Sequence, residues 1–258
     1  MSVIIVIPAR YGSSRFPGKP LAVIKGRTLI ERVWSICKTV RSVDRVYIAT
    51  DDQRIEAAAK KFKAEVVLTD PHCANGTERV FDALKRLAIE PQVVVNMQGD
   101  AVLTPPGVLE ALCAYMLAHP EVQMATPAAE LSAEEYSAAT RNPGRHSATY
   151  VTFDNSQNAL YFSRALIPKL RDADHEKGSA FRHIGIYAYR PETLRRYLEL
   201  PEGRLEKIEK LEQLRALENG IPIKVVTVNL AGRTPCSIDR PEDISRAEEL
   251  ISAQGELT

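Results

Sequence analysis

The sequence lacks the features of a membrane protein or a disulfide-stabilised secreted protein. No apolar run approaches the roughly 20 residues that a membrane-spanning helix needs. The apolar start of the chain, Val3–Ile7, ends at Pro8 and has no basic residue before it, so we expect no signal peptide. The four cysteines are far apart and form no Cys-x-x-Cys pair, as in reduced intracellular proteins. We therefore expect a cytoplasmic protein with no membrane insertion.

An excess of charge of either sign is also missing. The 258 residues carry 34 Lys and Arg against 33 Asp and Glu, which gives a formal net charge of +1. No global field therefore attracts the chain to nucleic acid or to an anionic membrane, and we expect no nucleic-acid partner. Hydrophobic residues make up 45% of the chain, which is enough for one sizeable core.

Two common nucleotide-binding fingerprints are absent. The chain contains no Gly-x-Gly-x-x-Gly segment, which sets aside a nicotinamide oxidoreductase. It also has no P-loop, because five residues separate Gly12 from Gly18 where the motif has four, and Pro20 follows Lys19 where the motif has Ser or Thr.

Short apolar strands alternate with helical patterns over the first 120 residues. The predicted strands are Val3–Ile7, Arg45–Thr50, Glu65–Thr69 and Val93–Met97. The first predicted helix starts at the capping box Thr28-x-x-Glu31. The other predicted helices cover Asp51–Phe62, about Thr77–Leu87 and a segment after Pro106. This alternation predicts a doubly wound, Rossmann-like α/β fold with a mostly parallel sheet. Its ligand should lie at the carboxyl ends of the strands.

The alternation of single strands and helices ends after residue 120. The predicted strands there are Gln123–Leu131, Ala148–Asp154, Ala159–Arg164, Arg182–Tyr189 and Ile223–Leu230, with a hairpin turn at Asp154–Asn158. The predicted helices are a short one opened by Pro191, a longer one over Leu205–Asn219 that Gly220 stops, and a last one over Glu242–Ala253. We expect one α/β domain over residues 1–258 with a smaller antiparallel β insertion.

The segment Pro8–Pro20, directly after the first strand, has the composition of a triphosphate-binding loop. It carries three cations and no acid, namely Arg10, Arg15 and Lys19, together with two glycines. Fixed positive charge and accessible backbone N–H groups at a strand end suit a triphosphate. A solvated basic surface loop is the alternative, but loops that a buried strand positions usually carry function.

Two other polar segments allow two interpretations each, and a third favours one. Gln98-Gly99-Asp100 follows a predicted strand, and alternation points Asn96, Gln98 and Asp100 to one side, into the predicted crevice at the carboxyl ends of the strands. Asp100 could bind Mg²⁺ there or form an ordinary turn. In Asn75–Arg79, Thr77 could cap a helix or the free N–H groups could hold a base or a phosphate. Composition alone favours Asp239 as a cap of the last helix.

Taken together, these segments resemble the 3-deoxy-manno-octulosonate (Kdo) cytidylyltransferases, or CMP-Kdo synthetases, over nearly the whole chain. The motifs that carry the resemblance are the loop from Pro8 to Leu21, Gly76–Arg79, Gln98–Asp100, Ala159–Arg164, Arg182–Tyr189, Glu209–Arg215 and Asp239–Asp243. The resemblance implies that CTP and an acidic sugar give the CMP-sugar and diphosphate. It further implies Mg²⁺ as cofactor, a homodimer, the nucleotide-diphospho-sugar transferase type of fold, and a place in lipopolysaccharide biosynthesis.

The resemblance also implies roles for individual residues. The triphosphate would be held by Arg10, Ser13, Arg15 and Lys19, and the cytidine by Asn75, Gly76, Thr77 and Arg79. Mg²⁺ would be bound by Asp100 and Asp239, which with Arg10 and Lys19 form the implied catalytic set. The sugar acid would contact Gln98, Arg164, His183, Tyr187, Glu212 and Gln213. By the same resemblance, residues 1–120 form the nucleotide-binding core, 121–222 the sugar-binding and dimerisation part, and 223–258 a return strand and C-terminal helix.

Three positions depart from the family pattern. Ala101 follows Gln-Gly-Asp where family members usually have Glu, Tyr150 stands where a Lys is usual, and Asn75 replaces a Ser. The phosphate loop is intact, and two of the changes fall toward the sugar end. Two alternatives therefore stay open: a cytidylyltransferase for another acidic sugar (8-amino-Kdo, a nonulosonate or a uronate), and an inactive CTP-binding paralogue.

Overall fold

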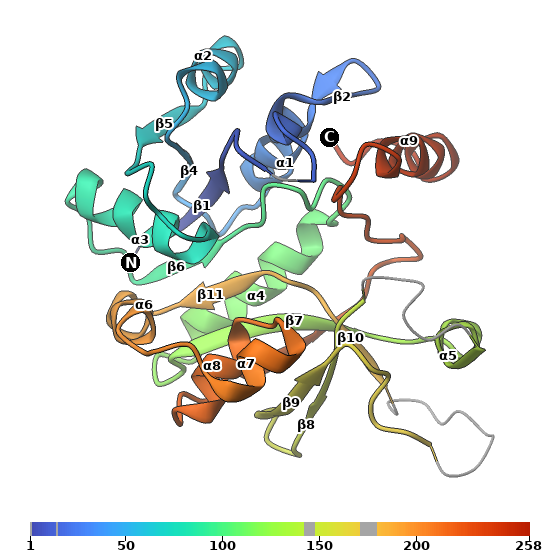
Figure 1. Ribbon diagram of the computed structural model, residues 1–258. Coiled ribbons are helices and arrows are strands. Elements are labelled where there is room, and N and C mark those ends of the chain that lie inside the picture. The colour runs from blue at the N-terminus through green and yellow to red at the C-terminus, as the bar shows by residue number, and fades with distance from the viewer. Residues whose placement is uncertain (1, 14, 142–147, 171–179) are drawn as a thin grey trace. The chain divides into compact units, whose positions relative to one another are not determined.

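The computed structural model describes residues 2–13, 15–141, 148–170 and 180–258, so Ser14 of the phosphate loop lies outside the described residues. The chain forms two compact units (Figure 1). The first unit comprises Met1–Ala114 and Leu230–Thr258, and the second comprises Tyr115–Asn229. No helix among the described residues is long and apolar enough to cross a bilayer.

The first unit contains a parallel sheet in the order β5-β4-β1-β6. Its strands are β1 (Val3–Ala9), β4 (Arg45–Thr50), β5 (Glu65–Leu68) and β6 (Val93–Asn96). Ile5, in the middle of β1, pairs with Val46 on one side and Val95 on the other and is fully buried. A strand that is covered on both faces needs an apolar residue at almost every position, which explains the continuous Val-Ile run.

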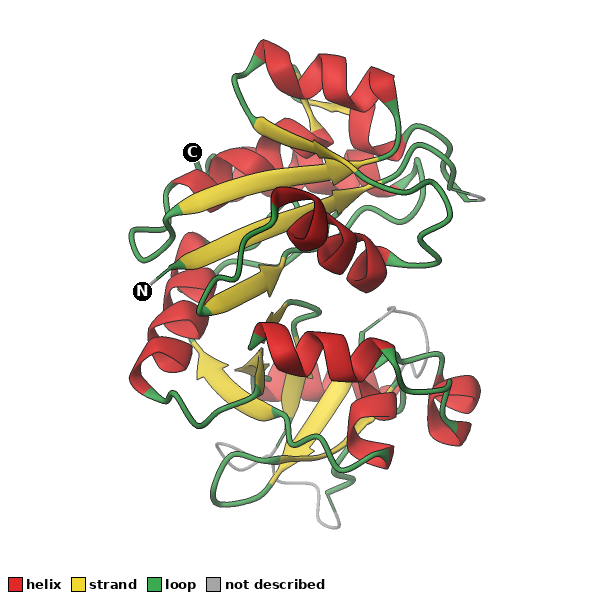
Figure 2. Ribbon diagram, turned by 90° about the vertical axis from the view of Figure 1, so that its left-hand side faces the viewer, coloured by secondary structure: helices red, strands yellow, loops and turns green. Residues whose placement is uncertain are grey.

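Helices lie in front of and behind these strands, as Figure 2 shows. The helices of the first unit are α1 (Leu29–Lys38), α2 (Gln53–Lys61), α3 (Gly76–Leu87) and α9 (Asp243–Gln254), while α4 (Pro106–Ala118) runs across the division between the units. A short 3₁₀ helix, η1 (Lys19–Leu21), and the hairpin of β2 (Val23–Ile24) and β3 (Arg27–Thr28) follow the phosphate loop. The prediction of a doubly wound α/β fold is confirmed.

One of the predicted helix-capping residues caps its helix in the structure, and two do not. The Thr28 side chain accepts a hydrogen bond from the Glu31 N–H at 3.4 Å, as the capping box predicts. The α3 cap is Asn75, whose Oδ1 accepts from the Glu78 N–H at 2.8 Å, so the prediction that Thr77 caps is wrong. Asp239 does not cap α9 either. Asn75 takes the capping role expected of Thr77, whereas α9 begins at Asp243 and its N-cap residue, Glu242, forms no side-chain capping hydrogen bond.

The second unit is built around β7 (Met124–Glu130) and contains the antiparallel pairs that the sequence predicts. β10 (Phe181–His183) and β11 (Tyr187–Tyr189) pair antiparallel with opposite ends of β7, while β12 (Lys224–Val228) pairs with it in parallel. β8 (Tyr150–Phe153) pairs with β10 and with β9 (Ala159–Ser163). The helices are α5 (Ala133–Arg141), α6 (Pro191–Leu198), α7 (Arg204–Glu209) and α8 (Gln213–Glu218).

Two predicted elements of the second unit are divided. The strand Arg182–Tyr189 breaks at Ile184–Ile186 into β10 and β11, and the Ile186 N–H turns back to the Ile184 carbonyl. The helix Leu205–Asn219 breaks into α7 and α8 at Lys210, whose φ is 55°. The periodicity continues through both breaks, so only contacts from other parts of the unit could have located them.

Candidate active site

The loops that leave the carboxyl ends of β1 and β6 come unusually close together. A Cβ atom on Gly99 would lie 2.7 Å from the Pro8 carbonyl oxygen, and one on Gly76 would lie 3.2 Å from Pro8 Cγ. A separation below 3.0 Å from a backbone atom leaves no room for a side chain. Gly99 is therefore required for the Gln98–Asp100 segment to pack beside the phosphate loop.

Lys19 joins this cluster to the C-terminal segment of the chain. Its Nζ donates to Asp100 Oδ2 at 2.7 Å and to the Ile238 carbonyl at 2.8 Å. The Ile238 N–H donates in turn to the Asp100 carbonyl at 3.1 Å. The Lys19 and Asp100 side chains keep 18% and 26% of their surface exposed, so both remain accessible to a ligand.

Asp239 follows Ile238 and brings the second predicted metal ligand to the same cluster. Arg15 Nη2 lies 3.4 Å from Asp239 Oδ1, and their side chains are 62% and 33% exposed. The backbone N–H groups of Asp239 and Arg240 both donate to Asp243 Oδ2 at 2.8 Å. Asp243 thus fixes the backbone and leaves the Asp239 carboxylate directed to Arg15.

The phosphate loop is folded back by its own backbone. The Gly18 N–H donates to the Tyr11 carbonyl at 2.9 Å, and Gly18 has a φ of 72°, which favours glycine. The guanidinium of Arg54 stacks 3.3 Å above the Tyr11 ring. Arg54 also forms hydrogen bonds to Asp52, which lower the pKa of that carboxyl. Arg10 is exposed and Ser13 is half-buried.

The residues predicted to surround the cytidine gather at the start of α3. Arg79 is buried, with Nη1 3.1 Å from Asp51 Oδ1 and 2.5 Å from Thr69 Oγ1. Its charge therefore holds the ends of β4 and β5 in place. The prediction that Asn96 points into an open crevice with Gln98 and Asp100 is wrong for Asn96. That side chain is fully buried and its Nδ2 donates to Thr77 Oγ1 at 3.2 Å.

In the second unit, His183 and Tyr187 come together although the strand breaks between them. Their ring centroids are 5.5 Å apart, and the edge of Phe162 approaches the imidazole at 5.0 Å. The Thr126 hydroxyl lies 2.9 Å from His183 Nε2. Burial lowers the pKa of His183 to about 3, so the imidazole is neutral at physiological pH. Burial also raises the pKa of Tyr187.

Arg164, another predicted sugar ligand, is held at the end of α7. Its Nε donates to the Glu209 carbonyl at 2.7 Å and its Nη2 to the Lys210 carbonyl at 3.2 Å. The Glu209 carboxylate accepts from the Ser163 hydroxyl at 2.9 Å and from the Arg164 N–H at 3.1 Å. These contacts account for the end of α7 at Glu209, because Arg164 satisfies the carbonyls that a helix end leaves free.

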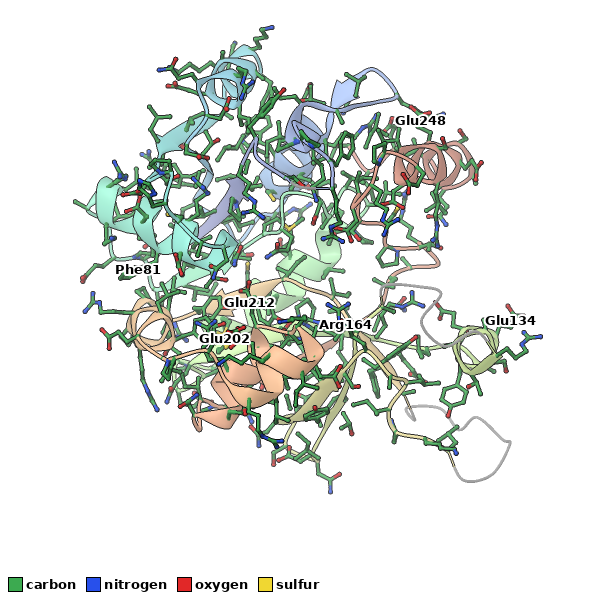
Figure 3. The ribbon with its side chains drawn as sticks, in the orientation of Figure 1. Phe81, Glu134, Arg164, Glu202, Glu212 and Glu248 are labelled. Atoms are coloured by element: carbon green, nitrogen blue, oxygen red, sulfur yellow. The ribbon has the colours of Figure 1, made fainter. Side chains whose placement is uncertain are left out.

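Glu212 and Gln213 stand at the start of α8, and Figure 3 labels Glu212 together with Arg164. Glu212 is exposed, and its carbonyl accepts from the Tyr197 hydroxyl at 3.0 Å. Gln213 is only 5% exposed, and its Nε2 has no hydrogen-bond partner among the described residues. A buried amide donor without an acceptor costs free energy unless a ligand supplies one.

An ion pair that joins α7 to α8 was not predicted from the sequence. Arg215 Nε and Nη2 donate to the two Glu206 carboxylate oxygens at 2.8 and 2.6 Å, with side chains only 13% and 5% exposed. The hydrogen bond to Glu206 raises the pKa of Arg215. Arg215 lies within the Glu209–Arg215 motif that the sequence analysis singles out. Its partner Glu206, nine residues earlier, lies in no motif, so the sequence did not indicate the pair.

The positions that depart from the family pattern differ in their surroundings. Tyr150 is buried against Leu131 and Ala180, and this burial raises the pKa of its hydroxyl. Ala101 is half-buried, and its N–H donates to the Gln98 carbonyl at 3.2 Å within the turn that carries Asp100. Tyr150 is therefore part of a packed core, whereas Ala101 lies directly beside a predicted metal ligand.

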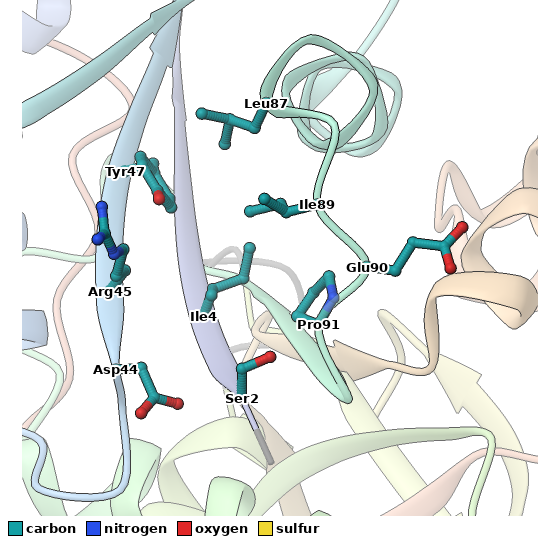
Figure 4. A pocket seen from close by; sticks show the side chains of 9 residues that line it. All are labelled: Ser2, Ile4, Asp44, Arg45, Tyr47, Leu87, Ile89, Glu90 and Pro91. Atoms are coloured by element: carbon teal, nitrogen blue, oxygen red, sulfur yellow. The ribbon is translucent and has the colours of Figure 1, made fainter.

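A cavity of about 490 Å³ lies in the first unit but belongs to the opposite ends of its strands. Its lining residues are Ser2, Ile4, Asp44, Arg45, Tyr47, Leu87, Ile89, Glu90 and Pro91, which are shown in Figure 4. Parallel α/β sheets bind ligands at the carboxyl ends of their strands. The cluster of Lys19, Asp100 and Asp239 is at those ends, so we take that cluster and not the cavity as the nucleotide site.

Comparison with known proteins shows the family of the chain. The family model for cytidylyltransferases matches residues 4–225. A 3-deoxy-manno-octulosonate cytidylyltransferase of Maricaulis maris (strain MCS10) is 51% identical over 259 residues, with 100% of both chains covered. An 8-amino-3,8-dideoxy-manno-octulosonate cytidylyltransferase of Shewanella loihica (strain ATCC BAA-1088 / PV-4) is 44% identical over 98% of this chain and 99% of its own.

A solved structure is also similar over its whole length. It is described as CMP:2-keto-3-deoxy-manno-octonic acid synthetase complexed with CTP, and it matches with a TM-score of 0.87 at 35% identity. The match covers 98% of this chain and 100% of that chain. The chain therefore belongs to the cytidylyltransferase family, which makes it a nucleotidyltransferase. Its full-length similarity to CMP-Kdo synthetases confirms the resemblance that the sequence motifs indicate.

Proposed function

We propose that this protein transfers CMP from CTP to the anomeric hydroxyl of 3-deoxy-manno-octulosonate and releases diphosphate. The observation that carries the proposal is the 51% identity, over the full length of both chains, to a 3-deoxy-manno-octulosonate cytidylyltransferase. The cluster of Lys19, Asp100 and Asp239 at the carboxyl ends of the parallel strands supports it, because that is where the triphosphate should bind.

The chemistry needs positioning and charge neutralisation and no covalent enzyme intermediate. The sugar hydroxyl attacks the α-phosphorus in line, and diphosphate leaves. Arg10, Arg15 and Lys19 would neutralise the triphosphate oxygens. Arg15 and Lys19 are each paired with a carboxylate that holds the cation in place. Fixed cations that need little rearrangement stabilise the charge that develops in the transition state.

The residues present fit a Mg²⁺ ion, which we propose as the cofactor. Two carboxylates, Asp100 and Asp239, come from segments that the Ile238–Asp100 backbone hydrogen bond ties together, and both are partly exposed. Mg²⁺ usually takes one or two carboxylates together with phosphate oxygens, and no cluster of three or more His, Cys, Asp or Glu occurs among the described residues. When bound, the ion would supply Lewis-acid activation of the sugar hydroxyl and of the α-phosphate.

The second unit would bind the sugar acid. Gln213 offers a buried amide donor that has no acceptor within the described part of the chain. His183 and Tyr187 form a rigid aromatic wall, and Arg164 adds an exposed cation for the carboxylate of the sugar. Buried polar groups that only the correct substrate satisfies are an effective source of specificity.

One alternative substrate has support of its own. Several relatives that are 41–44% identical over 98% of this chain, among them the Shewanella loihica protein, are 8-amino-3,8-dideoxy-manno-octulosonate cytidylyltransferases. An amine in place of the 8-hydroxyl adds a positive charge at one end of the sugar. The alternative is that the chain transfers CMP to this amino sugar.

Diphosphate release with CTP and Mg²⁺, measured in parallel on Kdo, 8-amino-Kdo and a sialic acid, tests the proposal. We expect turnover on Kdo to exceed turnover on the other acids by at least about tenfold, equivalent to about 1.4 kcal/mol. A preference for 8-amino-Kdo would establish the alternative. Absence of turnover on all three acids, with CTP still bound, would contradict the proposed function.

The resemblance to CMP-Kdo synthetases also leads us to propose a homodimer. Leu160 on β9 is 60% exposed, and β9 pairs only with β8 among the described strands. An exposed apolar residue on the last strand of a sheet is a suitable contact for a second copy. Sedimentation equilibrium should give twice the monomer mass of 28.6 kDa, and a Leu160→Lys variant should give the monomer mass.

A further inference from the structure

Thr126 lies opposite the break between β10 and β11, at the middle of β7. Its hydroxyl oxygen is within hydrogen-bond distance of three atoms: the carbonyl oxygens of Ile186 at 2.7 Å and Ile184 at 3.3 Å, and His183 Nε2 at 2.9 Å. Thr126 is fully buried, so these contacts are made away from water.

The chemistry of these atoms decides which group donates. A carbonyl oxygen can only accept, and a hydroxyl has a single hydrogen. The hydrogen of the Thr126 hydroxyl must therefore point to the carbonyls, of which Ile186 is nearer. Its oxygen is then left as an acceptor, and the contact with His183 requires that Nε2 carry a proton.

The break in the strand creates this arrangement. The Ile184 N–H donates to the Pro127 carbonyl at 3.0 Å, and the Ile186 N–H turns back to the Ile184 carbonyl. Both carbonyls of the break face the hydroxyl of the Thr126 side chain. A valine of the same shape would leave two buried carbonyls and one imidazole N–H without this partner.

We propose that Thr126 is a positioning residue that fixes His183 as the Nε2–H tautomer, so that Nδ1 accepts a hydrogen bond from a hydroxyl of the acidic sugar. The inference rests on the proposed function for the identity of the ligand, but the tautomer follows from the contacts alone. Phe162 and Tyr187 hold the ring plane, and Thr126 decides which of its nitrogens is an acceptor.

This assignment restricts what His183 recognises. A neutral imidazole that presents a lone pair binds an O–H or N–H donor and repels a carboxylate oxygen. The low pKa of His183 agrees with this, because the ring stays neutral throughout the physiological range. His183 would thus recognise a hydroxyl of the sugar, while Arg164 is the group suited to its carboxylate.

Nitrogen NMR on ¹⁵N-histidine-labelled enzyme tests the tautomer directly, with the His183→Gln variant used to assign the signal. We expect the wild-type Nε2 to be protonated and Nδ1 to be unprotonated. We expect Thr126→Val to lose this pattern, and Thr126→Ser, which keeps the hydroxyl, to retain it. A protonated Nδ1 in the wild-type enzyme would overturn the proposal.

Steady-state kinetics test the consequence. Thr126→Val should raise KM for the sugar acid about tenfold, because Nδ1 no longer accepts from the sugar hydroxyl, and should leave KM for CTP within about twofold. Thr126→Ser should restore KM for the sugar acid. An unchanged KM for the sugar in Thr126→Val, with the tautomer lost, would overturn the link to substrate. If no acidic sugar is turned over, the proposed function fails, while the NMR result still decides the tautomer.

Discussion

Lys19, Asp100 and Asp239 in the first unit and His183 and Gln213 in the second are held in opposite ways. In the first unit these side chains are charged and partly exposed, and Lys19 pairs with Asp100 while Arg15 pairs with Asp239. In the second unit, His183 and Gln213 are neutral polar groups buried among aromatic and apolar side chains. Two ion pairs offer a second contrast, since Arg45–Glu65 in the first unit is exposed whereas Arg215–Glu206 in the second is buried.

The difference follows from what each unit is proposed to bind. A triphosphate brings several negative charges. Exposed cations can exchange a carboxylate partner for a phosphate oxygen at little cost, because exposed ion pairs contribute little free energy. A sugar brings hydroxyl groups, and a site distinguishes them only when its own donors and acceptors are fixed and protected from water. We therefore expect substitutions in the first unit to act mainly on turnover and those in the second mainly on stability and sugar affinity.

The largest expected effect is on turnover and comes from the carboxylates of the first unit. Asp100→Asn and Asp239→Asn should each lower kcat by at least about 10³-fold, or about 4 kcal/mol, because each removes a proposed ligand of Mg²⁺. Diphosphate release measures this, and unchanged thermal unfolding shows that the fold is intact. Glu65→Gln removes an exposed, ion-paired carboxylate of the same unit and should retain full activity. A rate within tenfold of wild type in either Asp variant would contradict the metal assignment.

The next effect is on stability and contrasts the two ion pairs. Arg215→Met should lower the free energy of unfolding by about 3–5 kcal/mol, because it leaves the Glu206 carboxylate buried and unpaired. Arg45→Met, in the exposed pair, should cost less than about 1 kcal/mol. Denaturant unfolding of both variants gives the comparison, and equal losses would refute it.

A third prediction concerns the close approach of two loops in the first unit. Gly99→Ala should cost about 3 kcal/mol, because its Cβ would lie 2.7 Å from the Pro8 carbonyl oxygen and backbone must move. Turnover should fall as well, since Asp100 is the next residue. Gly107→Ala serves as the control, because a Cβ at Gly107 meets no atom within 4 Å. The measurements are denaturant unfolding and diphosphate release.

The smallest expected effect is a pH dependence from the second unit. The pKa of His183 is about 3 in the folded protein and about 6.5 in an unfolded chain. Between these values the unfolded state binds a proton that the native state does not, so stability falls as the pH falls. From pH 6.5 to pH 5, His183 should contribute a loss of about 2 kcal/mol. His183→Gln should remove this part of the slope, whereas His72→Gln, at an exposed position, serves as the surface control.

Much of the first unit could be predicted from its residues. The run Val3–Ile7 and the turns after each strand predicted a parallel sheet with its ligand at the carboxyl ends of the strands. The sheet could be predicted because local periodicity and burial agree in these strands. The prediction for Asn96 failed because alternation gives the side of a strand and not whether that side is open. The cap at Asn75 was missed because Thr77 is an equally good capping residue by type.

The sequence by itself determined the family, the parallel α/β core and the identity of the charged residues in the phosphate loop, since these depend on contiguous motifs and local periodicity. Only the tertiary structure decided that β10 and β11 separate at Ile184–Ile186, that Arg164 ends α7, and that Thr126 fixes the proton on His183. The physical reason is that each depends on a partner far away in the chain, and a single sequence carries no signal for which distant donor meets which acceptor.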